Sequence, residues 1–77
     1  MEIDSQLRQL VARVFKVAPD SLTPDSGPHS IPAWDSAAHM NLIVELEKEF
    51  RVQFGDDEVV ELVSVEAIQT ALNQHRG

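Results

Sequence analysis

The chain of 77 residues has no cysteine, few basic residues and no long apolar run. Without cysteine it cannot form disulfides or zinc-thiolate sites, and it has no side-chain thiol for chemistry. Its apolar stretches are far shorter than the roughly 20 residues that a membrane-spanning helix needs. The first residues also lack the basic segment and the apolar segment of a signal peptide, so we expect a cytoplasmic protein.

Basic residues number only 6 against 13 acidic ones, which gives a formal net charge of -7. Such a surface repels nucleic-acid phosphates and anionic lipid head groups, which argues against nucleic-acid and membrane binding. With 43% hydrophobic residues, the chain can fold around one small core, so we expect a single domain over residues 1–77. So small a domain has little room for a substrate cleft. We therefore expect a non-enzyme whose partners are proteins with basic patches.

All four prolines lie within residues 19–32. Proline has no amide donor and pushes the preceding residue away from helical conformation, so this stretch predicts a loop over residues 18–35. A loop of this length is unusual in so small a domain. We expect three large apolar residues, Leu22, Ile31 and Trp34, to pack it onto the core.

Apolar residues recur at helical spacing on both sides of this loop. The pattern predicts helices over about residues 4–17, 36–51, 56–62 and 64–74. Asp35 and Ser64 stand at N-cap positions, Gly55 is expected to stop the second helix, and three acids at 56–58 suit a helix start. The predicted fold is an all-α, small four-helix bundle, with three main helices, one short helix and a long loop between helices 1 and 2.

The dipeptide Asp-Ser occurs four times, so by itself it indicates nothing. Asp4-Ser5 is explained as a helix cap, and the pairs at 20–21 and 25–26 as turn residues beside prolines. Asp35-Ser36 differs because a long loop there runs into a long amphipathic helix. Ser36 would project from a helix N-terminus, where backbone amides and the helix dipole stabilise a phosphate. The alternative is that Ser36 is one more capping residue.

A longer pattern follows Trp34-Asp35-Ser36. It comprises Leu42, the run Glu45-Leu46-Glu47-Lys48-Glu49-Phe50, Val52, Phe54, Asp57-Glu58, and a closing Ser64-Val65 with Ile68 and Leu72. Over nearly the whole chain this pattern resembles an acyl carrier protein. In that family the serine of Asp-Ser is esterified by 4′-phosphopantetheine from coenzyme A. The resemblance implies attachment at Ser36, with Asp35 beside it in the cofactor site, and no catalytic residue.

The implied chemistry agrees with the composition. A carrier presents its acyl group as a thioester, and a chain without cysteine needs a prosthetic arm that ends in a thiol. By the same resemblance, the expected partners are a phosphopantetheinyl transferase, an acyl-loading ligase or acyltransferase, and a ketosynthase or another acyl-processing enzyme. We expect a monomer. The acids at 56–61 lack the spacing of a dedicated calcium loop, so no metal site is predicted.

The predicted second helix has two faces. Met40, Val44 and Glu47 fall toward the side of Ser36, away from the core stripe that includes Leu42 and Leu46. We predict that these three residues bind partners, with packing at the core boundary as the alternative for Met40 and Val44. His39 falls on the core side, where a packed or hydrogen-bonded histidine is expected.

The start of this helix departs from the family pattern. Where many carriers have leucine and acids, this chain has Ala37, Ala38 and Asn41. The neutral start predicts a discrete carrier of a dedicated pathway, such as polyketide or related secondary-metabolite biosynthesis. The alternatives are a peptidyl or aminoacyl carrier of a nonribosomal pathway, or an acidic helical interaction module without a prosthetic group. A hydrolytic set of Asp35, Ser36 and His39 is disfavoured, because neighbours on one turn do not easily form the required chain of hydrogen bonds.

Overall fold

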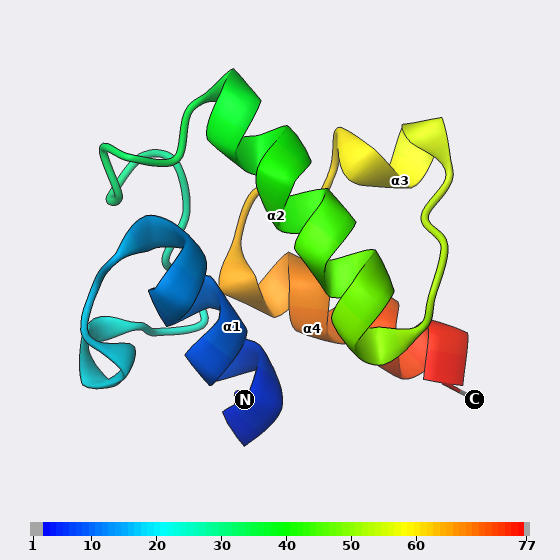
Figure 1. Ribbon diagram of the computed structural model, residues 1–77, viewed down its shortest axis with the longest axis horizontal. Coiled ribbons are helices and arrows are strands. Elements are labelled where there is room, and N and C mark those ends of the chain that lie inside the picture. The colour runs from blue at the N-terminus through cyan, green and yellow to red at the C-terminus, as the bar shows by residue number, and fades with distance from the viewer. Residues whose placement is uncertain (1–2, 77) are drawn as a thin grey trace.

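A computed structural model describes residues 3–76 of the chain. Over these residues it contains four α-helices and one short 3-10 helix, with no strand (Figure 1). In chain order the elements are α1 (Ser5–Phe15), η1 (Pro19–Ser21), α2 (Ser36–Phe50), α3 (Asp56–Val59) and α4 (Val65–Arg76). The predicted all-α fold, with three main helices, one short helix and a long first loop, is confirmed.

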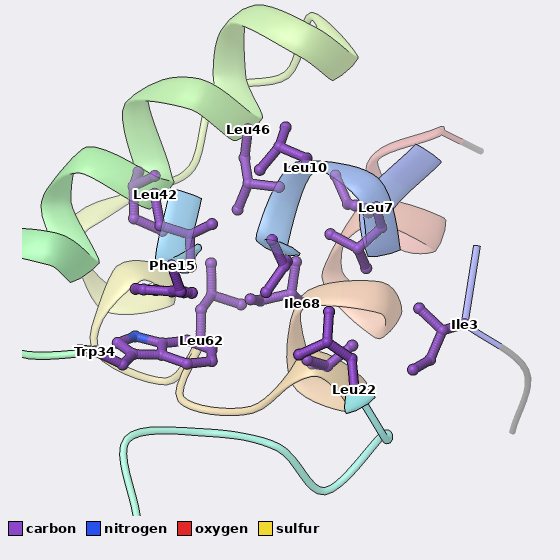
Figure 2. Close-up of a cluster of buried hydrophobic side chains, with 14 of the residues drawn as sticks. Ile3, Leu7, Leu10, Phe15, Leu22, Trp34, Leu42, Leu46, Leu62 and Ile68 are labelled. Atoms are coloured by element: carbon purple, nitrogen blue, oxygen red, sulfur yellow. The ribbon is translucent and has the colours of Figure 1, made fainter. Parts of the chain in front are cut away.

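The three long helices pack around one apolar core, and the chain measures 28 × 26 × 19 Å along its principal axes. Figure 2 shows Trp34 and Phe15 at one end of this core and Ile3 at the other. The largest fully buried side chains come from α1, α2 and α4, and they are Leu7, Leu10, Val11, Leu42, Leu46, Val65, Ile68 and Leu72. Each lies on the apolar stripe of its helix, so burial of these stripes is what assembles the bundle. No helix in the described part of the chain is long and apolar enough to cross a membrane.

The long loop is fixed at both of its ends and at its centre. As predicted, Leu22, Ile31 and Trp34 are buried in the core. The Arg8 guanidinium of α1 donates to the carbonyl oxygens of Pro19 and Leu22, at 2.8 and 3.0 Å. These contacts hold the 3-10 helix η1, which the proline pattern did not predict.

The centre of the loop caps α4. The carbonyl oxygens of Ser26 and Pro24 accept the amides of Val65 and Glu66, at 2.9 and 2.8 Å. The Ser64 hydroxyl accepts the Ala67 amide at 3.0 Å, as its N-cap position predicted. These bonds satisfy amides that a helix start leaves without intrahelical partners. The loop is thereby part of the folded domain.

Helix ends differ from the predicted ranges for local reasons. α2 ends at Phe50 because Arg51 adopts a left-handed conformation (φ 54°) and its amide bonds the Glu47 carbonyl. The expectation that Gly55 stops α2 is therefore wrong, and Gly55 instead precedes α3. Lys16 ends α1 in the same left-handed way. Asp4 occupies the N-cap position of α1, but its side chain makes no capping hydrogen bond.

The third helix is shorter than the predicted 56–62. α3 closes at Val59, and the next residues form a tighter turn in which amides bond carbonyls three residues back. The Glu61 amide reaches the Glu58 carbonyl at 2.9 Å, and the Leu62 amide reaches the Val59 carbonyl at 3.3 Å. Leu62 is buried as a result.

Candidate functional site

Asp35 and Ser36 form the junction between the long loop and α2. The Asp35 carboxylate accepts the Ala38 amide at 2.8 Å, and its carbonyl accepts the His39 amide at 2.8 Å. Asp35 is therefore a true N-cap. Ser36 is the first residue of α2 and is exposed, and its hydroxyl makes no hydrogen bond to the residues that the structure describes. Asp35 thus makes the capping hydrogen bond, and the Ser36 hydroxyl stays accessible for modification.

The electrostatics at this point favour an anion. α2 has 15 residues, and the partial positive charge of a helix lies at its N-terminus. A phosphodiester on Ser36 would lie at that end, beside backbone amides. An exposed hydroxyl with an open approach and a favourable helix end fits the attachment of a phosphate-linked group.

Trp34 anchors the residues before Ser36. Its indole ring is 3% exposed and stacks on Phe15 of α1, with ring centroids 4.8 Å apart. Its Nε1 lies 2.9 Å from His39 Nδ1, and His39 Nε2 lies 2.8 Å from the Val59 carbonyl oxygen. His39 is thus packed and hydrogen-bonded, as its place on the core side predicted. Trp34 and His39 therefore fix the backbone on either side of Ser36.

A surface hollow of about 490 Å³ opens beside Ser36. We call it the Ser36 hollow, and its lining residues are Pro28, Trp34, Asp35, Ser36, His39, Met40, Val59, Val60 and Val63. Most of these side chains are apolar, and three of them, Met40, Val60 and Val63, are also large and exposed. The hollow therefore offers an apolar surface next to the Ser36 hydroxyl.

Sequence reasoning missed the contribution of Val60 and Val63. Helical spacing placed Met40 near Ser36, but no periodicity relates α2 to the residues after α3. Gly27 is the signal that was available, because a Cβ at this position would collide with the Val63 carbonyl oxygen. Because Gly27 has no side chain, the long loop can approach Val63 in the connection between α3 and α4. Pro28 and Val63 therefore line the same hollow.

Met40 and Val44 lie one helical turn apart, with exposed fractions of 53% and 45%. Met40 lies at the Ser36 hollow, whereas Val44 does not line it. Glu47 is half-buried, and its carboxylate accepts the Phe54 amide at 2.9 Å. Glu47 therefore fastens the connection between α2 and α3. Partner binding by Met40, Val44 and Glu47 stays a prediction, and Glu47 has a structural contact in addition.

The other acids of α2 also have contacts within the molecule. Glu45 lies 3.8 Å from the Arg13 guanidinium of α1, and Glu49 accepts a hydrogen bond from the Gln6 side chain at 3.0 Å. Both contacts join α2 to α1. The acids of α2 are therefore used in packing helices together, and none of them lies at the Ser36 hollow.

Glu58 links α3 to the end of α4. Its carboxylate accepts the Gly55 amide at 3.1 Å and lies 2.9 Å from His75 Nε2. The Gly55 amide first, and then the hydrogen bond from His75, lower the pKa of Glu58 below its ordinary value of 4.5. The His75 ring also meets Phe54 edge to face, with centroids 5.2 Å apart. Among the described residues, no group of three or more histidines and acids is placed to hold a metal ion.

Comparisons with known proteins agree with this arrangement. A family model described as a phosphopantetheine attachment site matches residues 5–72. An acyl carrier protein from Campylobacter hominis is 30% identical over 70 residues, which cover 91% of this chain and 89% of that protein. One from Lactobacillus acidophilus is 29% identical over 76 residues, covering 99% of this chain and 95% of that protein.

Similarity in structure is also high. The solution NMR structure of a holo acyl carrier protein from Geobacter metallireducens superposes with a TM-score of 0.81 at 31% identity. The match covers 91% of this chain and 80% of the Geobacter chain.

Fold and site define a small helical carrier that presents an exposed serine at a helix start. The chain belongs to the acyl carrier protein family, whose members bear a phosphopantetheine attachment site. It is accordingly a carrier and not an enzyme, and its prosthetic group is a covalently attached phosphopantetheine.

Proposed function

We propose that this protein is an acyl carrier in which Ser36 bears the 4′-phosphopantetheine arm and delivers acyl thioesters to partner enzymes. The observation that carries the proposal is the exposed Ser36 hydroxyl, free of hydrogen bonds within the described residues, at the N-terminus of α2. Ser5, at the start of α1, does not line the Ser36 hollow. The Ser21 hydroxyl, at the end of η1, already donates to the Ala18 carbonyl oxygen at 2.6 Å.

The modification makes Ser36 Oγ the nucleophile. It attacks the pyrophosphate phosphorus that carries the pantetheine group of coenzyme A, a phosphodiester forms, and adenosine 3′,5′-bisphosphate leaves. The hydroxyl proton passes to a base of the transferase, because no described side chain of this protein accepts a hydrogen bond from the Ser36 hydroxyl. The thiol at the end of the arm then carries the acyl group as a thioester, which a chain without cysteine cannot form on its own. The arm keeps the acyl group at high effective concentration near each partner.

We further propose that partners recognise α2 mainly through apolar contact. Ala37 and Asn41 are exposed and uncharged at the start of the helix, and Met40 and Val44 are the large apolar side chains beside them. The acids further along α2 are engaged in contacts within the molecule. Such a surface suits the enzymes of a dedicated pathway, such as polyketide or related secondary-metabolite biosynthesis, acting on a monomeric carrier in the cytoplasm.

The test of attachment is the intact mass of the protein after incubation with coenzyme A and a broad-specificity phosphopantetheinyl transferase. The native protein should gain one phosphopantetheinyl unit, and Ser36→Ala should gain none. Ser21→Ala is the matched control, since Ser21 also follows an aspartate, and it should be modified like the native protein. If the native protein gains no mass, or if Ser36→Ala gains it, the proposal is wrong and an interaction module without a prosthetic group becomes the better account.

A further inference from the structure

Positive charge gathers on one face of this acidic molecule. α1 and α2 lie side by side and antiparallel (Figure 1). Gln6 near the start of α1 contacts Glu49 near the end of α2, and Arg13 in the last turn of α1 contacts the middle of α2. Four of the six Lys and Arg residues stand in or just after the last turns of these two helices, and all four are exposed. We call them the basic face, and they are Arg13, Lys16, Lys48 and Arg51.

The four cations follow one another along this face. Arg13 lies level with Glu45, because their side chains are 3.8 Å apart. Lys16 lies three residues further along α1, and Lys48 and Arg51 lie three and six residues beyond Glu45 in the opposite direction. At about 1.5 Å per residue of helix, the row is about 14 Å long.

The acids of α2 leave most of this charge unneutralised. Glu45 and Glu49 are engaged with side chains of α1, and Glu47 accepts an amide from the segment after α2. Among the residues that the structure describes, the three cations other than Arg13 form no ion pair. The basic face is therefore available to an anionic partner, although the chain as a whole has a formal net charge of -7.

Two of these cations occupy backbone positions where glycine is usual. Lys16 and Arg51 end their helices in the left-handed region, with φ of 56° and 54°. A residue with a Cβ is strained there, and helices commonly end in glycine at this place. The structural explanation for the cations is their favourable interaction with the helix C-termini. Binding of an anionic partner is a second explanation, and an experiment can separate the two.

We propose that the basic face docks an acidic segment of a partner protein. Opposite charge provides the complementarity. A short acidic segment suits the face better than a long polyanion, because the negative remainder of the molecule repels any polyanion that extends beyond it. None of the four cations lines the Ser36 hollow, so a partner held here leaves Ser36 open to a second enzyme. Docking of this kind does not require the prosthetic group.

The probe for this surface is hexaglutamate labelled with fluorescein. An extended peptide covers about 3.4 Å per residue, so hexaglutamate is long enough to span the face. Fluorescence anisotropy at low salt measures binding, and chemical-shift changes in amide NMR spectra locate it. We expect hexaglutamate to bind in spite of the net charge, to shift amides at the C-terminal ends of α1 and α2, and to bind more weakly as salt is added. Hexalysine is the control and should instead shift amides of the acidic α3.

Substitution of single cations tests the face directly. Lys48→Gln should weaken hexaglutamate binding about threefold, the effect of one exposed ion pair. Lys48→Arg retains the charge and should bind like the native protein. Lys16→Gly and Arg51→Gly each remove a charge and relieve backbone strain, so binding should weaken while the melting temperature does not fall. If all these variants bind like the native protein, the cations serve only the helix ends and the proposal is wrong.

Further controls separate this inference from the proposed function and from other anions. Ser36→Ala should bind hexaglutamate like the native protein, so a failure of modification with binding intact contradicts attachment at Ser36 alone. Phosphatidylglycerol vesicles and single-stranded DNA present negative charge in other forms. If either binds more tightly than hexaglutamate at equal concentration of charge, the docking of an acidic protein segment is wrong. The same conclusion follows if hexaglutamate does not bind, or shifts amides outside the basic face.

Discussion

The side chain and the backbone of Glu47 both make contacts at the end of α2. Its carboxylate accepts the Phe54 amide, and its carbonyl accepts the amides of Arg51 and Val52 at the end of α2. Both ends of the residue therefore shape the connection that leads to α3. Any effect of Glu47 on partner binding has to be separated from this structural contribution.

Glu47→Ala should lower the free energy of unfolding by about 1–2 kcal/mol, because the half-buried Phe54 amide loses its acceptor. Glu47→Gln retains an amide oxygen at the same place and should lose less. Urea unfolding followed by Trp34 fluorescence measures both. Equal losses in the two variants would show that the charge of Glu47, rather than its hydrogen bond to Phe54, is what stabilises the fold.

Gly27 is a second residue on which the site depends. A Cβ at this position would collide with the Val63 carbonyl oxygen. Because this oxygen is a backbone atom, it cannot move aside as the end of a flexible side chain could. Gly27→Ala should therefore destabilise the fold by about 1–3 kcal/mol. Gly55→Ala is the control, since its Cβ would meet only the Glu58 carboxylate, at 3.9 Å. A Gly27→Ala protein as stable as Gly55→Ala in thermal unfolding would contradict the close packing of the loop on Val63.

At the scale of elements, α2 divides into two halves with different uses. Its first half is uncharged around Ser36 and exposes Met40 and Val44. Its second half carries three acids, each with a contact inside the molecule. The charge of this helix therefore contributes more to the bundle than to the surface beside Ser36.

Apolar recognition predicts how modification responds to substitution. Met40→Ala and Val44→Ala should each slow holo-protein formation by the transferase about fivefold, the effect of losing about 1 kcal/mol of apolar contact in an interface. Asn41→Ala, on the same helix, should leave the rate unchanged. If the rate is unchanged in Met40→Ala and Val44→Ala but falls steeply in Glu47→Gln or with added salt, recognition is electrostatic and the apolar account is wrong.

Glu58 links α3 to His75 of α4, and this contact predicts a pH dependence. Because the folded state lowers the pKa of Glu58, its carboxylate stabilises the fold above pH 4.5, and this contribution is lost as the pH falls through the lower folded value. The melting temperature of the native protein should exceed that of Glu58→Gln near neutral pH, and the difference should vanish in acid.

Glu61→Gln removes the same charge from the same region and serves as the control for this pH dependence. It should shift the melting temperature little, since Glu61 is exposed. A difference between native and Glu58→Gln proteins that persists well below pH 4.5 would contradict the role given to the Glu58 carboxylate.

On the scale of the whole molecule, much of the fold follows from local sequence signals. Apolar periodicity located the three long helices, the clustered prolines located the loop, and Leu22, Ile31 and Trp34 marked where it packs. Asp35-Ser36 stood out by its context at a loop–helix junction. These features depend on residues near one another in the chain, which is why the sequence alone predicts them.

Features that join distant segments did not follow from the sequence. The wall formed by Val60 and Val63, the bond between His39 and Val59, and the contact between Glu47 and Phe54 each depend on how α3 meets α2. Tertiary packing decides these contacts, and no periodicity records them. The early end of α3 and the left-handed Arg51 were not predicted either, because no residue type at these positions signals them.

The acids that give the net charge of -7 lie mostly away from the Ser36 hollow. Asp35 is the one acid that lines the Ser36 hollow, and its carboxylate is engaged as an N-cap. The exposed acids Asp56, Asp57 and Glu61 lie on and after α3. A negative surface is unfavourable for binding nucleic-acid phosphates and anionic lipids. In our proposal, the apolar surface beside Ser36 selects among protein partners.

The most direct test is the mass of the protein isolated from its native host under conditions that preserve thioesters. We predict that the fragment containing Ser36 carries one phosphopantetheinyl unit, with an acyl group that hydroxylamine removes. That group would also distinguish an acyl from an aminoacyl cargo and indicate the pathway. A host protein that bears no phosphopantetheine, or bears it on a residue other than Ser36, would contradict the account.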